Sequence, residues 1–346
     1  MAERNSEKNI ALFQEEKPSL ESYWRSIVLF GRNTASYKFS LAESLIALAN
    51  EGKTTVSLTE LANPYSSNIC RHILQEKRQA TNPSSTFLEA CDSFNQNKLS
   101  HEELISTTVK HGFNWVLDCF HTVNGGDLPV KFFEKDGKKL ILTDEVLRLA
   151  NADSALNLYH ENEARWNLVE TAWKLNISPD LLNVCYDDQS KILFIDEQFK
   201  RKDITSARGA LDGYQKGKCF YCFDDIIVSD DENNTCDVDH FFPHTLQHLM
   251  PEINLNGVWN LVLACPNCNR GANGKFAKVP TIKYLERLHK RNEFLISSHH
   301  PLRETIINQT GKTEQARATF LREIDRRAIN LLIHRWDTEE KQEACF

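Results

Sequence analysis

Two Cys-x-x-Cys pairs constrain the fold of this chain more than any other feature of its sequence. The first pair is Cys219-Phe-Tyr-Cys222 and the second is Cys265-Pro-Asn-Cys268, with 42 residues between them. Each pair presents two thiolates from one tight turn, and two such pairs complete a tetrahedral Zn²⁺ site that has no open position. The spacing therefore predicts a structural zinc ion that joins two distant segments of a small subdomain.

The other cysteines, the first residues and the lengths of the apolar runs indicate the cellular compartment of the protein. Six further cysteines are scattered singly, which argues against a disulfide framework and in favour of reduced, inert thiols. The first residues are charged and lack the apolar core of a signal peptide. No apolar run approaches the roughly 20 residues that span a bilayer. We therefore expect a cytoplasmic protein that makes no membrane contact.

The chain of 346 residues exceeds the ordinary size of one domain, which favours two domains. The periodicity of its apolar residues predicts both helices and strands, and so an α+β fold. Residues 1–18 are polar and predict a disordered tail. Residues 19–196 predict a mostly helical domain, in which Trp24, Trp166 and Trp173 lie at helical spacing and belong to the core. Residues 197–346 predict a zinc-stapled domain with C-terminal helices. The expected elements are helices at about 58–79, 84–96, 100–120, 153–175, 197–215, 267–271, 282–295 and 313–336, a hairpin at 184–195, and strands at 236–242 and 258–264.

Polar residues follow one another in a fixed order around the second cysteine pair. Asp239-His240 precedes Pro243, Asn260 precedes a leucine, and Asn269 follows Cys268. From Cys219 to Lys275 this order resembles the HNH endonuclease superfamily, and the Asp-Val-Asp-His and Asn-Arg-Gly portions resemble the HNH domain of CRISPR effector nucleases. The resemblance implies a ββα-metal fold, one catalytic divalent metal ion that is usually magnesium, and cleavage of DNA.

Phosphodiester hydrolysis needs an activated water molecule, a sink for the charge on the phosphorane, and stabilisation of the departing 3′ oxygen. His240 is expected to be the general base, because imidazole accepts a proton near neutral pH. Asp239 and Asn269 are expected to give oxygen ligands to Mg²⁺ or Mn²⁺. Asp239 can do so beside His240 only where the alternation of the strand breaks. The resemblance gives Asn260 a supporting role, in which it holds the His240 loop by hydrogen bonds.

The third residue of the motif and the phosphate contacts stay open. The lysine of the motif usually follows the asparagine by about three residues, whereas Lys275 lies six residues after Asn269. Either the chain carries a short insertion, or Asn273 is the third residue; Asn269 is favoured because it follows a zinc cysteine directly. Arg270, Lys275 and Lys278 are natural phosphate contacts, with solvated surface charge as the alternative.

The net charge of −7 is distributed unevenly along the chain. From Arg270 to the end there are 15 Lys and Arg against 10 Asp and Glu, whereas the rest of the chain holds 26 against 38. The basic excess thus follows the candidate site directly, where a polyanion would lie. The acidic N-terminal part is a poor surface for DNA, and we expect it to bind a partner protein, to regulate the nuclease or to self-associate.

The sequence therefore predicts a Mg²⁺-dependent DNA endonuclease, and the resemblance alone suggests a role in restriction or anti-phage defence. Two alternatives remain. One is a zinc-dependent module that binds nucleic acid without cutting it, against which the complete set of Asp239, His240, Asn260 and Asn269 argues. The other is an HNH nuclease that acts on RNA, which nothing in the sequence excludes.

Overall fold

The computed structural model describes residues 19–346 except 31–33, 82–83, 124–125, 176–183, 198–199, 230–234 and 299. The tail predicted at 1–18 lies outside the described residues. The contacts divide the chain into two compact units, one of which is Pro18–Ile177, while the other includes Ser178–Phe346. This division precedes the boundary placed at 196, because the hairpin near 184–195 belongs to the second unit.

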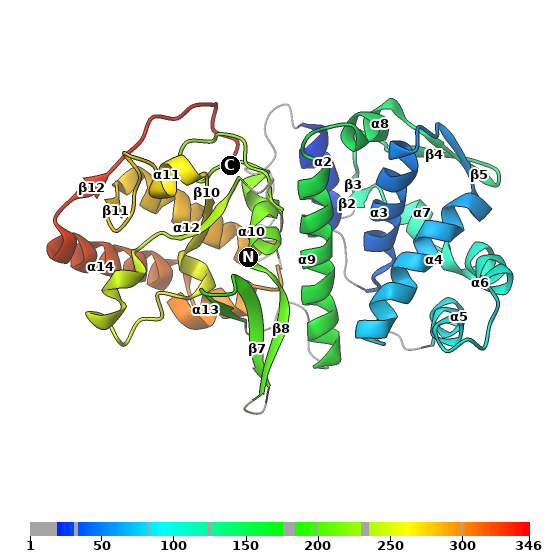
Figure 1. Cartoon of the computed structure of the whole chain (residues 1–346), viewed down its shortest axis with the longest axis horizontal. Helices are drawn as coiled ribbons and strands as arrows, with labels where there is room; N and C mark the ends of the chain where they lie inside the picture. Colours follow the sequence, from blue (N-terminus) through cyan, green and yellow to red (C-terminus); the bar gives the residue numbers. More distant parts are fainter. Residues whose placement is uncertain are drawn as a thin grey trace. The chain divides into compact units, whose positions relative to one another are not determined.

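The N-terminal unit is mostly helical, and Figure 1 labels most of its elements. A short antiparallel sheet has the strand order β1-β5-β4, and a second small sheet pairs β2 with β3. The helices pack around buried aromatic side chains that include Trp24, Trp166 and Trp173, as their spacing predicts. The elements are α2 (Leu20–Phe30), α3 (Tyr37–Asn50), β1 (Thr55–Ser57), α4 (Leu58–Gln75), α5 (Thr86–Asn95), α6 (His101–Thr107), a π-helical turn (Thr108–Gly112), α7 (Val116–Cys119), β2 (Thr122–Val123), β3 (Gly126–Asp127), β4 (Phe133–Asp136), β5 (Lys139–Leu142), α8 (Asp144–Ala150) and α9 (Ala155–Lys174).

The C-terminal unit mixes small sheets with helices. An antiparallel sheet of order β6-β7-β8 comes first, β9 pairs with β10 antiparallel, and β11 pairs with β12 parallel. Helices α12, α13 and α14 pack against one another (Figure 1). The elements are β6 (Cys185–Asp187), β7 (Ile192–Glu197), β8 (Lys200–Ser206), α10 (Ala207–Gln215), β9 (Asp237–His240), 3-10 turns (His244–His248 and Val258–Asn260), β10 (Leu261–Ala264), α11 (Pro266–Arg270), β11 (Val279–Pro280), α12 (Ile282–Ser297), α13 (Arg303–Thr310), α14 (Glu314–Leu332) and β12 (Arg335–Trp336).

The mixture of helices and strands confirms the expected α+β class, but three predicted helices differ in detail. In place of the first part of the helix expected at 197–215, the chain forms strand β8, whose backbone pairs with β7, and helix α10 begins only at Ala207. The helix expected at 100–120 is broken at Trp115, whose φ is +69°. The last helix stops at Leu332, because Ile333 adopts a left-handed φ of +54° and the chain then pairs with β11.

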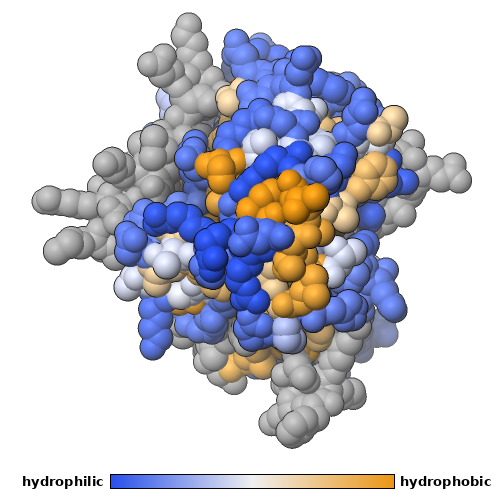
Figure 2. All heavy atoms as spheres, turned by 90° about the vertical axis from the view of Figure 1, so that its left-hand side faces the viewer, coloured by the Kyte–Doolittle hydropathy of each residue, from blue (hydrophilic) through white to orange (hydrophobic). Residues whose placement is uncertain are grey.

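Several exposed apolar side chains lie in the segments next to the paired strands β11 and β12. Phe276, Ile282, Leu331 and Ile333 are all exposed, and their segments meet at the β11–β12 pair. Figure 2 shows apolar side chains with a polar surround on the face of this unit. In the described parts of the chain, none of the helices has the length and apolar character needed to cross a membrane.

Candidate functional site

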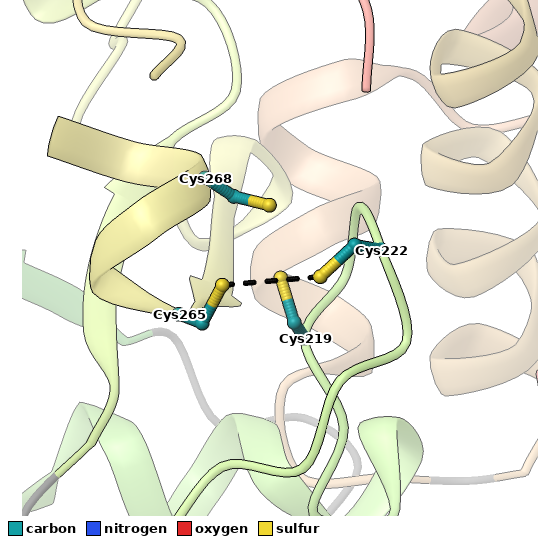
Figure 3. Close-up of side chains that lie close together, drawn as sticks. All are labelled: Cys219, Cys222, Cys265 and Cys268. Carbon is teal, nitrogen blue, oxygen red and sulfur yellow. Dashed lines mark hydrogen bonds between the residues drawn. The ribbon is translucent and has the colours of Figure 1, made fainter. Parts of the chain in front are cut away.

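The four paired cysteines come together in one buried cluster. The sulfur atoms of Cys219, Cys222, Cys265 and Cys268 all lie within 4.8 Å of one another. The Sγ atoms of Cys222 and Cys265 are 3.8 Å apart, and a tetrahedral ion with Zn–S bonds of about 2.3 Å requires a sulfur–sulfur separation of about 3.8 Å. Figure 3 shows the four thiols pointing toward one another from two separate segments. The cluster can hold a metal ion and is compatible with structural zinc.

Local backbone geometry aims these thiols inward. In the first knuckle, Phe223 donates its N–H to the carbonyl of Cys219 and has a left-handed φ of +61°, which closes the turn. In the second, Cys265 is the N-cap of α11 and Pro266 occupies the first turn, where its missing N–H costs nothing. The N–H of Phe220 bonds to the carbonyl of Leu263 and ties the first knuckle to β10.

The four thiols lie close enough to form hydrogen bonds with one another. Hydrogen bonds, above all with Cys219, lower the pKa of Cys265 and raise the pKa of Cys268. Four thiolates so close together would repel one another, and a divalent cation removes that repulsion by replacing the protons. Among the described residues, this is the one group of three or more histidine, cysteine or carboxylate ligands that could share an ion.

His240 ends β9 and is held from several sides. Its Nε2 lies 2.8 Å from Oδ1 of Asn256, and its Nδ1 lies 3.9 Å from Oδ1 of Asp188. The rings of Tyr186 and His244 lie 6.0 and 5.7 Å from the imidazole. Burial lowers the pKa of His240, although the Asp188 carboxylate and the Asn256 hydrogen bond oppose that effect. The imidazole is therefore neutral at pH 7, as a general base must be.

Asp239 has different partners from its neighbour His240. Its Oδ2 accepts a hydrogen bond from the hydroxyl of Tyr221 at 2.6 Å, and its Oδ1 lies 3.1 Å from Nζ of Lys275. The same ammonium donates to the carbonyl of His240 at 2.9 Å. The regular alternation of β9 turns the two side chains to opposite faces, so the break required for a shared metal ion does not occur. A buried cation already neutralises the Asp239 carboxylate.

The basic residues expected at phosphates divide into two kinds. Lys275 is 0% exposed and lies inside the unit, away from the surface position that a phosphate contact needs. The Arg270 side chain is 65% exposed and pairs with Asp237, with Nε 2.8 Å from Oδ2. Lys278 is exposed. Arg270 and Lys278 therefore remain accessible to a phosphate, whereas Lys275 neutralises a carboxylate within the protein.

Asn269 faces β9, but it meets a different aspartate from the one expected. Its Nδ2 donates to Oδ2 of Asp237 at 3.1 Å, which leaves Asp239 and Asn269 with separate partners. Asn273 is exposed, and its carbonyl accepts a hydrogen bond from Nε1 of Trp336 at 2.8 Å. Of the two asparagines considered for the third motif position, the structure thus places Asn269 against the strand.

Asn260 is fully buried and makes three hydrogen bonds. Its Oδ1 accepts from the N–H of Phe242 at 2.8 Å, and its Nδ2 donates to the carbonyls of Phe242 and Leu255 at 3.0 and 2.9 Å. A buried amide with all these partners fixes the backbone that it joins. The segment after His240 is therefore tied to the start of β10.

Three residues near the site escaped the sequence reasoning. Asp188 comes from the turn of the β6–β7 hairpin, Asn256 precedes β10, and Tyr221 lies within the first cysteine knuckle. Partial burial raises the pKa of Asp188. The Lys191 ammonium and the His240 imidazole lower this pKa by more than burial raises it, so the carboxylate stays ionised. These residues belong to no motif with a fixed spacing. The sequence indicates them only as polar side chains in turns beside the expected motif elements.

Ion pairs with acidic residues that precede Arg270 neutralise most of the basic excess of the C-terminal part. The pairs are Arg270 with Asp237, Lys275 with Asp239, Arg327 with Glu252, and Lys341 with Asp224. Among the described residues that follow Arg270, exposed lysines without a carboxylate partner are Lys278, Lys290 and Lys312. A polyanion would meet a weaker positive surface than the net charge indicates.

Comparisons with protein-family models, with curated proteins and with solved structures found no match to this chain. The geometry of the site therefore carries the functional argument.

Proposed function

We propose that the chain is an HNH-type endonuclease that hydrolyses phosphodiester bonds in nucleic acid, with DNA as the first substrate to test. The observation that carries the proposal is the placement of His240. A neutral imidazole ends one strand of an antiparallel pair, its Nε2 is held by Asn256, and its Nδ1 faces a carboxylate. Helix α11 follows the second strand and carries Cys268 of the cysteine cluster.

The proposed reaction uses His240 to accept a proton from water as the water oxygen attacks phosphorus. The bond from phosphorus to the 3′ oxygen then breaks, and the products are a 5′-phosphate and a 3′-hydroxyl. Arg270 and Lys278 are exposed near α11 and would contact phosphates of the bound nucleic acid. Asn260 supports the loop that follows His240.

The residues present fit one of the two expected metal ions and not the other. The four cysteines fit Zn²⁺, because their softness, number and spacing match a closed tetrahedral site. Asp239 and Asn269, the side chains expected to hold Mg²⁺ or Mn²⁺, do not fit that role as they stand. Both oxygens of the Asp239 carboxylate already have partners, Lys275 at Oδ1 and Tyr221 at Oδ2, and Asn269 bonds to Asp237. The chemistry proposed here therefore rests on the chain's own residues.

The buried Lys275–Asp239 pair favours a second candidate function, a module that binds nucleic acid without cutting it. A binding module has no use for a catalytic divalent metal ion, and a carboxylate that is permanently neutralised costs it nothing. His240 argues for the nuclease, because a pure binding module does not require a neutral base beside an ionised carboxylate.

An assay on purified full-length protein separates these functions. Supercoiled plasmid and single-stranded RNA are incubated with wild type in Mg²⁺, in Mn²⁺ and in EDTA. We expect nicking of DNA by wild type, and a loss of about 10²–10⁴-fold in His240→Ala. His248→Ala, which changes an exposed histidine in the adjacent 3-10 turn, is the matched control. Binding without cleavage by wild type would select the binding module, and cleavage of RNA alone would change the substrate.

The biological role proposed for such a nuclease is restriction or anti-phage defence, on the resemblance alone. The N-terminal unit would then bind a partner protein, regulate cleavage or bring two copies together. Its interior contains buried ion pairs, such as Arg25 with Glu161 at 2.7 Å.

A further inference from the structure

We infer that Asp188 is a second catalytic residue of this site, which orients the attacking water together with His240. The inference rests on the proposed nuclease function and deepens it. Asp188 lies before the segment that resembles HNH nucleases, in the hairpin formed by β6 and β7. The chain therefore adds a group to the site from a separate sheet.

The hairpin turn fixes Asp188 firmly. In the same turn, Oδ1 of Asp187 accepts the N–H groups of Gln189 and Ser190 at 2.9 and 3.4 Å, which is an Asx turn. The Lys191 ammonium lies 2.7 Å from Oδ1 of Asp188. Tyr186, two residues earlier, sets its ring edge-on to the His240 imidazole. The hairpin thus contacts the candidate base through two residues.

The hydrogen bond to Asn256 determines which nitrogen of His240 is available. The amide oxygen of Asn256 can only accept, so Nε2 carries the imidazole proton and Nδ1 carries the lone pair. Nδ1 is the atom that faces Asp188, at 3.9 Å. That separation is too long for a direct hydrogen bond. The two acceptors therefore lie side by side without satisfying each other.

One water molecule can donate to both acceptors. With hydrogen bonds of about 2.8 Å to Nδ1 and to Oδ1, a water molecule spans the 3.9 Å between them and has both its protons engaged. Its lone pairs then point away from the two residues, toward a phosphate. In the reaction, one proton passes to Nδ1 as the water oxygen bonds to phosphorus. The departing 3′ oxygen takes a proton from solvent, and Asp188 keeps its charge.

Asp188 is the more accessible residue of this pair. The His240 side chain is 10% exposed, whereas the Asp188 side chain is 36% exposed. A phosphate can therefore approach from the side of the hairpin turn, where Lys191 lies. When such orientation of a nucleophile is lost, the reaction rate typically falls by a factor of about 10².

The test compares Asp188→Asn with Asp187→Asn in the full chain. Asparagine at 187 keeps the oxygen that accepts the turn hydrogen bonds, so this control preserves the hairpin. We expect Asp188→Asn to lower the single-turnover rate at saturating DNA on the order of 10²-fold, with melting temperature and zinc content unchanged. DNA affinity should be unchanged or tighter, because a negative charge is removed. Asp187→Asn should cut at the wild-type rate.

A double variant distinguishes action on the same water from action elsewhere. Adding Asp188→Asn to His240→Ala should cause no further loss, because the two residues act on one water molecule. A full additional loss in the double variant would overturn the proposal, as would an unchanged rate in Asp188→Asn alone. If wild type does not cut nucleic acid, the proposed function fails and this inference falls with it; if wild type cuts and Asp188→Asn matches it, the inference alone fails.

Discussion

Two buried histidines, one in each unit, differ in what surrounds their ring nitrogens. His72 in the N-terminal unit stacks on Trp166 with ring centroids 3.5 Å apart, and both its nitrogens meet carboxylates, Glu170 at 2.8 Å and Glu163 at 3.1 Å. His240 in the C-terminal unit bonds to an amide through Nε2 and leaves Nδ1 without a direct hydrogen bond to Asp188.

Burial alone would lower the pKa of both imidazoles. At His72 burial acts in that direction, but hydrogen bonds to Glu163 and Glu170 prevail and raise the pKa to about 9. At His240 burial prevails, because its nearest carboxylate is too distant to bond directly. The partners therefore decide whether a buried histidine is a fixed cation within a scaffold or a neutral base. The predictions below test this difference between the units.

Loss of the cysteine cluster should have the largest effect and should be confined to the C-terminal unit. Cys268→Ser removes one thiolate from a site whose metal ion contributes folding free energy directly, typically about 10–16 kcal/mol for small zinc domains. We expect no bound zinc by elemental analysis and a lost melting transition for this unit. Cys119→Ser, at an exposed cysteine of the N-terminal unit, should change neither. Wild type that folds without zinc would contradict the metal assignment.

The sequence predicted this cluster completely because identical ligands in two paired turns have one stable arrangement. It also predicted β9, β10 and most helices, since their periodicity is local. It did not predict β8, because strand formation there depends on pairing with β7. The interior position of Lys275 was missed for a similar reason: a lysine in a polar loop indicates a surface, and only the tertiary fold brings Asp239 to it.

Removal of the Lys275 ammonium should have the next largest effect. Lys275→Met leaves the Asp239 carboxylate buried without its cation, which typically costs about 3–5 kcal/mol. Urea unfolding should show that loss, and the double variant Lys275→Met with Asp239→Asn should recover much of it. A surface lysine would behave differently, because its loss would weaken DNA binding and leave the stability unchanged. Full stability of Lys275→Met would place Lys275 at the surface after all.

The charge on His72 should make the stability of the N-terminal unit depend on pH. Its folded pKa of about 9 lies above the unfolded value of about 6.5, so the stabilisation is fully present below pH 6.5. It is lost as the pH rises through 9, by an amount on the order of 3 kcal/mol. Urea titrations between pH 6 and 10 should show this slope in wild type and a flatter one in His72→Gln. Equal slopes would mean that His72 is neutral.

The most direct test of the account compares the two histidines in one cleavage assay. Single-turnover rates on a DNA substrate are measured for wild type, His240→Ala and His72→Gln at pH 7, under conditions in which circular dichroism shows each protein folded. The account predicts that His240→Ala loses about 10²-fold or more, whereas His72→Gln cuts at the wild-type rate. Wild-type cleavage by His240→Ala, or an equal loss in both variants, would contradict the assignment of His240 as the base.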